Sequence, residues 1–136
     1  MHVLFCVKVI IWKGGRHSLN GSKPEYRIKH IGINHPDAEQ AMETAKKLCE
    51  IFDLPLNRET GTRIFAGNLF EVKKNCARGR LGHIALQTED IETAINDLAT
   101  KGIGILEETI RRKDDGRISF VFLDFELAGF AFHLEL

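Results

Sequence analysis

The spacing of apolar residues along the chain switches between the two-residue period of strands and the longer period of helices, and it does so in a regular order. From residue 26 apolar and polar residues alternate as in a strand, and from residue 37 apolar residues recur at helical spacing up to about Phe52. Three shorter alternating segments follow at about 56–59, 62–66 and 69–74, with a tight turn at Gly67-Asn68. The pattern predicts one strand, one helix and then three short strands.

A second round of the same elements begins near residue 81. It has a strand at 83–87 and a helix from Ile91 to about Leu98, which Gly102 would close in the left-handed conformation. Strands at about 105–111, 117–124 and 130–136 complete this round, with a hairpin turn at 114–116. We therefore predict an α+β fold made of two βαβββ modules, at about 26–76 and 81–136.

The two rounds also match residue by residue, which indicates an internal duplication. The segment that begins at His30 aligns with the segment that begins at His83, and the same offset pairs Asp37 with Asp90. The closing strands align as well, with the segment 66–72 against 128–134. This second alignment makes Glu71 and His133 equivalent positions.

Duplication has a geometric consequence for these residues. Two modules related by a pseudo-twofold axis would form a curved mixed sheet around a cavity, and equivalent inward positions would converge on its concave surface. Each first strand could lie beside the last strand of its own module or of the other module. In both cases His30 and His83, from the first strands, would face Glu71 and His133, from the last.

Bulk properties limit the function classes. The formal net charge of +0 argues against nucleic acid and anionic membranes as partners, and no apolar run reaches the length of about 20 residues that spans a bilayer. Three widely spaced cysteines suit a reducing, cytoplasmic setting. Residues 1–24 read as an N-terminal extension, with one extra strand followed by a Gly- and Ser-rich linker, and 25–136 as a single domain.

The motif Gly82-His83-Ile84-Ala85-Leu86, followed by an acidic helix start, resembles the vicinal oxygen chelate superfamily, which includes glyoxalase I, methylmalonyl-CoA epimerase and extradiol dioxygenases. The resemblance covers about residues 26–136. It implies metal ligands on the first and last strands of each module, and these fall at His30, Glu71, His83 and His133.

Several strings more closely resemble the domain of this fold that is appended to some bacterial 2-keto-3-deoxy-6-phosphogluconate aldolases. They are His30-Ile31-Gly32-Ile33-Asn34, Ile64-Phe65-Ala66-Gly67, Gly82-His83-Ile84-Ala85 and Gly129-Phe130-Ala131-Phe132-His133-Leu134. An aldolase barrel of about 250 residues does not fit in this chain.

Three imidazoles and a carboxylate suit a divalent ion such as Zn²⁺, Ni²⁺, Co²⁺, Mn²⁺ or Fe²⁺. Such a site predicts a lyase or isomerase acting on a small oxo or hydroxy acid or ketone, with Glu71 or Glu135 as the base. Glu135 shares a strand face with His133 and could replace it as a ligand. The alternative is that the strand histidines are hydrogen-bonded core residues.

Two other functions remain open from the sequence. A non-catalytic binding module would use aromatic residues to line a pocket for a small molecule: Phe65, Phe70, Phe120, Phe122 and Phe132. The alternative place for most of these residues is the hydrophobic core. A regulatory or dimerising domain would act through pairing, and we expect a homodimer. His35 reads as a solvated turn residue. Two basic runs would form solvated surface or attract an anionic substrate: Lys73, Lys74, Arg78 and Arg80, and Arg111, Arg112 and Lys113.

Overall fold

A computed structural model describes residues 23–136, so the extra strand predicted near the start of the chain lies outside the described residues. The elements follow the predicted order: β1 (Arg27–Ile33), α1 (Ala38–Phe52), β2 (Leu56–Asn57), β3 (Arg63–Ala66), β4 (Phe70–Lys73), β5 (Gly82–Gln87), α2 (Ile91–Thr100), β6 (Ile105–Arg112), β7 (Ile118–Leu127) and β8 (Phe130–Glu135). None of the helices in this part of the chain is long and apolar enough to cross a membrane.

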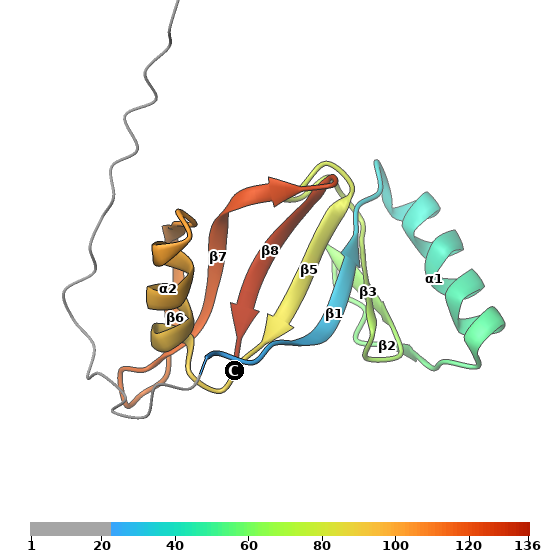
Figure 1. The fold of residues 1–136 in the computed structure, drawn as a ribbon. Coiled ribbons are helices and arrows are strands. Elements are labelled where there is room, and N and C mark those ends of the chain that lie inside the picture. Colours follow the sequence, from blue (N-terminus) through green and yellow to red (C-terminus); the bar gives the residue numbers. More distant parts are fainter. Residues whose placement is uncertain (1–22) are drawn as a thin grey trace, which may run out of the picture.

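The strands form one mixed sheet in the order β2-β3-β4-β1-β5-β8-β7-β6. The first strands of the two modules, β1 and β5, pair antiparallel at its centre, and each pairs in parallel with the last strand of its own module, β4 or β8. The sheet curves between α1 at one end and α2 at the other (Figure 1). The predicted α+β fold of two modules in one curved sheet is confirmed, and each first strand lies beside its own last strand.

The helices begin at equivalent caps. The side chain of Asp37 accepts a hydrogen bond from the amide of Gln40 at 2.8 Å, and that of Asp90 accepts one from the amide of Thr93 at 3.0 Å. Each carboxylate satisfies an amide that the first helical turn leaves without an intrahelical partner. Gly102 follows α2 with φ of +78°, the left-handed conformation expected after a helix end.

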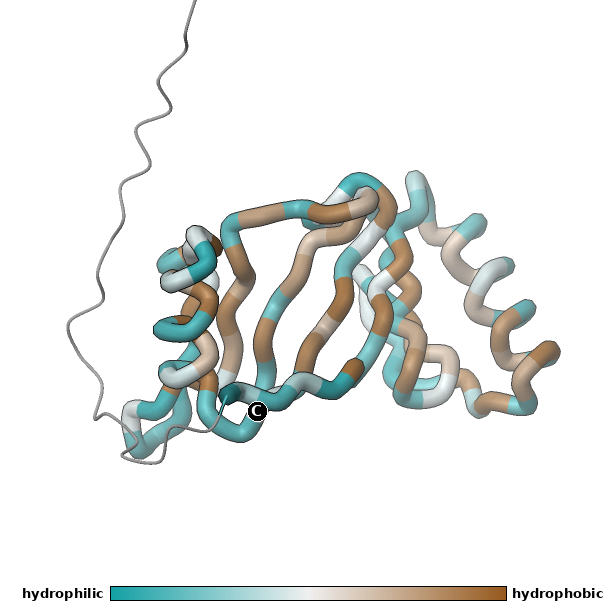
Figure 2. Tube along the Cα trace, in the orientation of Figure 1, coloured by the Kyte–Doolittle hydropathy of each residue, from teal (hydrophilic) through white to brown (hydrophobic). Residues whose placement is uncertain are grey.

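Both helices cover the same face of the sheet. Apolar side chains of α1 pack with Ile64 and Val72, and those of α2 pack with Val121 and Leu134. Hydrophobic positions recur along the strands and helices, whereas hydrophilic ones gather in the turns (Figure 2). Because neighbouring residues of a strand point to opposite faces, Glu71 and His133, which adjoin Val72 and Leu134, project from the face opposite the helices, which we call the concave face.

Candidate metal centre

The register of the central strands brings the predicted site residues together in two rows. One row runs from His30 on β1 through Ala85 on β5 to His133 on β8. The other runs from Glu71 on β4 through Gly32 on β1 to His83 on β5. In each row a small residue separates the two larger ones, which leaves room for all four polar side chains above the sheet.

The tightest contacts join His30, His83 and Glu71. The Nε2 atoms of the two histidines lie 3.1 Å apart, and the Glu71 Oε2 atom lies 3.0 Å from His30 Nε2 and 3.1 Å from His83 Nε2. All three residues are buried. The structure therefore places the three polar atoms at the corners of a nearly equilateral triangle.

His133 completes the group. Its ring centre lies 5.3 Å from that of His30 and 5.0 Å from that of His83, and each of the three histidines offers a nitrogen within 4.8 Å of the others. Within residues 23–136, the Nδ1 atom of His133 is buried without a hydrogen-bond partner. Buried polar atoms in folded proteins are rarely left unsatisfied, so this nitrogen points to a missing partner.

Gly32 is required for the position of His83. The two residues pair directly across β1 and β5, and a Cβ atom at Gly32 would stand 2.1 Å from Cε1 of the His83 ring. Any side chain at this position would force the imidazole to move. The equivalent position in the second module is Ala85, which lies between His30 and His133.

The carboxylate of Glu71 is held by groups of opposite charge on both sides. Its Oε1 atom accepts a hydrogen bond from Arg63 at 3.1 Å and lies 3.8 Å from Nζ of Lys73. Burial alone would raise the pKa of Glu71, but hydrogen bonds from His30 and His83, together with their charge, outweigh burial and hold the pKa well below its usual range. Glu71 is therefore an anion at neutral pH.

His133 is neutral for a different reason. Burial is the largest cause that lowers the pKa of His133 to about 3; electrostatic effects of His83, His30 and Arg111 add to it, against the opposing charge of Glu71. Neutral imidazole is the form that binds metal ions, so His133 needs no deprotonation to act as a ligand.

Glu135, predicted as a base or alternative ligand, lies at the edge of this group. Its Oε1 atom is 3.7 Å from Nδ1 of His133, too far for a hydrogen bond, and its Oε2 atom forms an ion pair with Lys29 at 3.1 Å. Its side chain is 19% exposed, against 5% for Glu71. Glu135 is thus near the cluster but open to a molecule bound above it.

Aromatic rings form the two walls beside the cluster. Phe65 contacts the ring of His30 edge-on at 5.8 Å, and the rings of Phe120 and Phe122 lie 4.6 and 5.0 Å from that of His133. The other two predicted pocket residues do not line this face: Phe70 packs with the core under α1, and Phe132 packs with the core under α2. Each adjoins a site residue in its strand and so points to the opposite face.

Some of the basic residues predicted at the rims contact the site, and others do not. Lys73 contacts Glu71, whereas Lys74 pairs with Glu59. Arg78 and Arg111 stack on Phe122 and Phe120. Arg63 and Arg58 also border the site, next to Phe65, although no sequence pattern singles them out.

His35 is not the solvated turn residue that the sequence predicts. It is half-buried, and its Nε2 atom hydrogen-bonds the hydroxyl of Thr44 at 2.8 Å, joining the end of β1 to α1. It takes no part in the histidine cluster.

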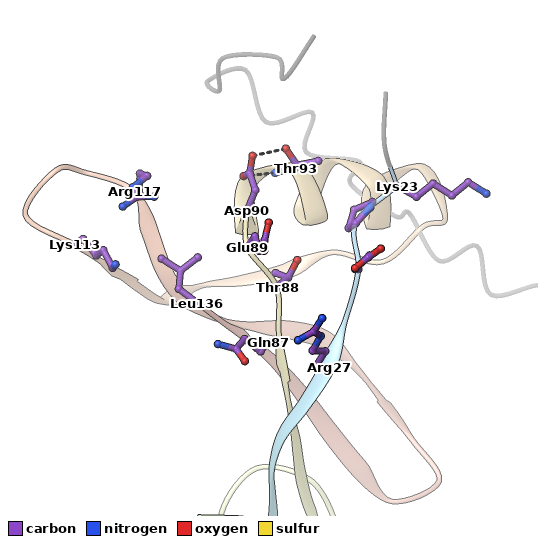
Figure 3. Close-up of a pocket in the computed structure, with 12 residues that line it drawn as sticks. Lys23, Arg27, Gln87, Thr88, Glu89, Asp90, Thr93, Lys113, Arg117 and Leu136 are labelled. Atoms are coloured by element: carbon purple, nitrogen blue, oxygen red, sulfur yellow. Dashed lines mark hydrogen bonds between the residues drawn. The ribbon is translucent and has the colours of Figure 1, made fainter. Parts of the chain in front are cut away.

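The structure also has a cavity of about 750 Å³ at another place, where β1 begins and β5 and β8 end (Figure 3). Residues of both charges line it, among them Lys23, Arg27, Glu89, Asp90 and Arg117. The four site residues are not among the described residues that line this cavity.

The cluster has the composition and spacing of a metal centre. Ligands about 2.1 Å from a common ion, in tetrahedral or octahedral geometry, stand about 3.0–3.4 Å apart. The donor atoms of His30, His83 and Glu71 have separations of 3.0–3.1 Å, and His133 adds a neutral nitrogen donor. The residues present therefore fit a divalent ion.

Comparison with known proteins identifies the fold. No protein-family model and no curated protein sequence matches the chain. Among solved structures, a hypothetical protein from Bacillus halodurans superposes with a TM-score of 0.54 at 17% identity, over 82% of this chain and 94% of its own. A methylmalonyl-CoA epimerase in complex with methylmalonyl-CoA and NH4+ superposes with a TM-score of 0.50 at 22% identity, over 79% and 92%.

A Streptomyces coelicolor methylmalonyl-CoA epimerase variant, in complex with 2-nitronate-propionyl-CoA, gives a TM-score of 0.50 at 20% identity, over 79% of this chain and 92% of its own. The resemblance to the aldolase-associated domain stays a prediction. Together with the duplicated βαβββ modules, these matches show that the chain has the vicinal oxygen chelate fold.

Proposed function

We propose that this chain binds a divalent metal ion through His30, Glu71, His83 and His133, and acts as a lyase or isomerase on a small oxo or hydroxy acid or ketone. The observation that carries the proposal is the triangle of donor atoms from His30, His83 and Glu71, with a nitrogen of His133 within 4.8 Å of those of the two other histidines. The Nδ1 atom of His133 is also buried without a hydrogen-bond partner among the described residues, which is unusual for a histidine of a packed core.

A bound ion would polarise a substrate carbonyl and stabilise the enolate that forms when a neighbouring proton is removed. The chain's own residues then divide the remaining tasks. The carboxylate of Glu71 contacts His30, His83 and Arg63. Because these contacts hold it in place, Glu71 suits the role of a ligand better than that of a mobile base. Glu135 is more exposed and lies next to the cluster, so we assign it the role of proton acceptor.

The aromatic walls would exclude water from one side of the substrate. The fold is shared with an enzyme named as an epimerase, which is in keeping with an isomerase reaction. Five ions accept imidazole and carboxylate ligands and suit this donor set: Zn²⁺, Ni²⁺, Co²⁺, Mn²⁺ and Fe²⁺.

Elemental analysis of the purified protein, followed by calorimetric titration with each ion, tests the proposal. We expect about one ion per chain in the wild type and a loss of affinity of at least about tenfold in His30→Ala and His83→Ala. His35→Ala is the matched control, because it removes a histidine that lies outside the cluster. A wild type that takes up no ion would refute the proposal.

The second candidate is a non-catalytic binding module, favoured by the rings of Phe65, Phe120 and Phe122 on the concave face. It predicts a ligand-induced rise in melting temperature that persists in the presence of a chelator. Homodimer formation also stays a prediction, and light scattering of the full chain measures it directly.

A further inference from the structure

Four guanidinium groups border the concave face, each near an aromatic ring of its walls. On the β3 side, the Cζ atoms of Arg58 and Arg63 lie 3.9 and 5.9 Å from the centre of Phe65. On the β7 side, Arg78 lies 5.3 Å from Phe122, and Arg111 lies 4.5 Å from Phe120. Positive charge therefore flanks the cluster in both modules.

Two of these arginines have no carboxylate partner within the described chain. Arg63 is bound to Glu71 at 3.1 Å, and Arg78 lies 3.7 Å from Glu108. Over residues 23–136, neither Arg58 nor Arg111 forms an ion pair, and the polar contact recorded for Arg58 is a long one, 3.4 Å, to the neutral side chain of Asn68. These two guanidinium groups are available to an anion.

Both free arginines are held in place beside the cluster. The ring under Arg58 contacts His30, and the ring under Arg111 contacts His133 at 4.6 Å between centres. Stacking on an aromatic face orients the guanidinium plane and leaves its N–H groups at the edge. The backbone of Arg58 has φ of +44°, a left-handed conformation that residues other than glycine rarely adopt, so a costly geometry is maintained at this position.

We propose that the concave face binds an organic dianion, with one anionic group on Arg58, the other on Arg111, and the histidine cluster between them. Guanidinium groups bind carboxylate and phosphate oxygens through paired hydrogen bonds, and both classes of anion share this chemistry. The inference deepens the proposed function by naming the charge and shape of its ligand. The inference rests on the proposed function for the biological role of the site. The contacts with the anion are made by Arg58 and Arg111, neither of which is a proposed metal ligand.

Calorimetric titration of the full chain with succinate, acetate and inorganic phosphate tests the inference, with and without a saturating divalent ion. We expect succinate to bind more tightly than acetate by about tenfold or more, since a second charge-assisted contact is added. Phosphate binding tighter than that of acetate, but dependent on one arginine alone, would identify phosphate as the group recognised at that end.

Arg58→Met and Arg111→Met should each weaken succinate binding by about tenfold or more, because methionine keeps the side-chain bulk and removes the charge. Arg117→Met is the matched control: it removes an exposed arginine that lines the separate cavity of Figure 3. If only Arg117→Met weakens binding, or if succinate and acetate bind equally, the inference is overturned.

Metal titration of the same variants separates this inference from the proposed function. Arg58→Met and Arg111→Met should keep at least the metal affinity of the wild type, because neither arginine hydrogen-bonds a histidine of the cluster in the described residues, and loss of the positive charge of Arg111 near His133 favours a cation. Loss of anion binding with metal affinity retained supports the inference. Dianion binding by a protein that takes up no ion would sustain the inference while the proposed function fails.

Discussion

The imidazole of His83 occupies the space into which a side chain on Gly32 would project, although the two residues lie 51 positions apart in sequence and on different modules. A methyl group at Gly32 would stand 2.1 and 2.2 Å from the Cε1 and Nδ1 atoms of the ring, well inside van der Waals contact. The position of one metal-competent nitrogen thus depends on the absence of a side chain on the neighbouring strand.

Gly32→Ala should therefore weaken metal binding without replacing any ligand. Displacement of the His83 ring breaks its contacts with Glu71 and His30, and we expect a loss of affinity of about tenfold or more, measured by calorimetric titration. Gly61→Ala is the control, since a Cβ atom there meets no other atom within 4 Å. Equal affinity in both variants would show that the ring is free to move aside.

Glu71→Gln tests the carboxylate while keeping its size. Loss of the negative charge leaves His30 and His83 without their anionic acceptor and Arg63 without its ion pair. We expect metal affinity to fall by about ten- to a hundredfold. Thermal unfolding of the metal-free protein should show a lower melting temperature, because removing one partner of a buried charge network is destabilising. An unchanged titration curve would remove Glu71 from the ligand set.

His133 and Glu135 should respond differently to substitution. His133→Asn removes the nitrogen that is buried without a partner, and we expect weaker metal binding by about tenfold or more. Glu135→Gln should leave the metal affinity close to that of the wild type, because its carboxylate is directed to Lys29. Titration of both variants with the same ion makes the comparison, and the reverse outcome would make Glu135 the fourth ligand.

The stability of the metal-free protein should fall on acidification, in part through His133. Its pKa is lowered to about 3 in the folded protein from 6.5, so the unfolded chain binds the extra proton between these values. The stability that the folded protein gains from keeping His133 neutral is fully present above about pH 6.5 and is lost as the pH falls toward 3. Over this range the free energy of unfolding changes by up to about 1.4 kcal/mol per pH unit. The lowered pKa of Glu71 acts in the same direction below 4.5.

Chemical denaturation in the presence of a chelator, between pH 7.5 and pH 4.5, measures this effect. His133→Leu should have a smaller pH slope than the wild type, since it lacks the titrating ring. The charged and titratable groups around His133 remain in that variant and provide the common background: His30, His83, Glu71, Glu135 and Arg111. Identical slopes for the two proteins would show that His133 titrates normally.

The internal repeat explains why the four cluster residues could be predicted from sequence. His30 and His83 begin matching strings, and the alignment of the closing strands paired Glu71 with His133. The ladders of the two modules have the same register: Gly32 pairs with Glu71 in one, and Ala85 with His133 in the other. A duplicated sequence therefore carries three-dimensional information about equivalent positions.

Arg58 and Arg63, which lie beside Phe65, could not be predicted from the repeat in this way. Arg63 pairs with Lys73, and its counterpart Phe120 pairs with Glu135, so the repeat places an aromatic residue where the first module has a cation. Arg58 lies in the connection between β2 and β3, which the strand pattern does not position. The repeat gave no signal at either residue.

The core positions of Phe70 and Phe132, in contrast, can be predicted from the sequence. Each immediately precedes a residue that was assigned to the concave face, Glu71 or His133, and strand alternation already places such neighbours on opposite faces. Phe65 and Phe122, which lie opposite Glu71 and His133 on the neighbouring strands, were assigned to the correct face.

The antiparallel seam between β1 and β5 divides the donor set evenly: each half of the molecule supplies one residue from its opening strand and one from its closing strand. A polypeptide consisting of a single module would contain only two of the four metal-binding side chains, too few to enclose an ion. Such a half would acquire a complete centre only by associating with a second copy across the same seam.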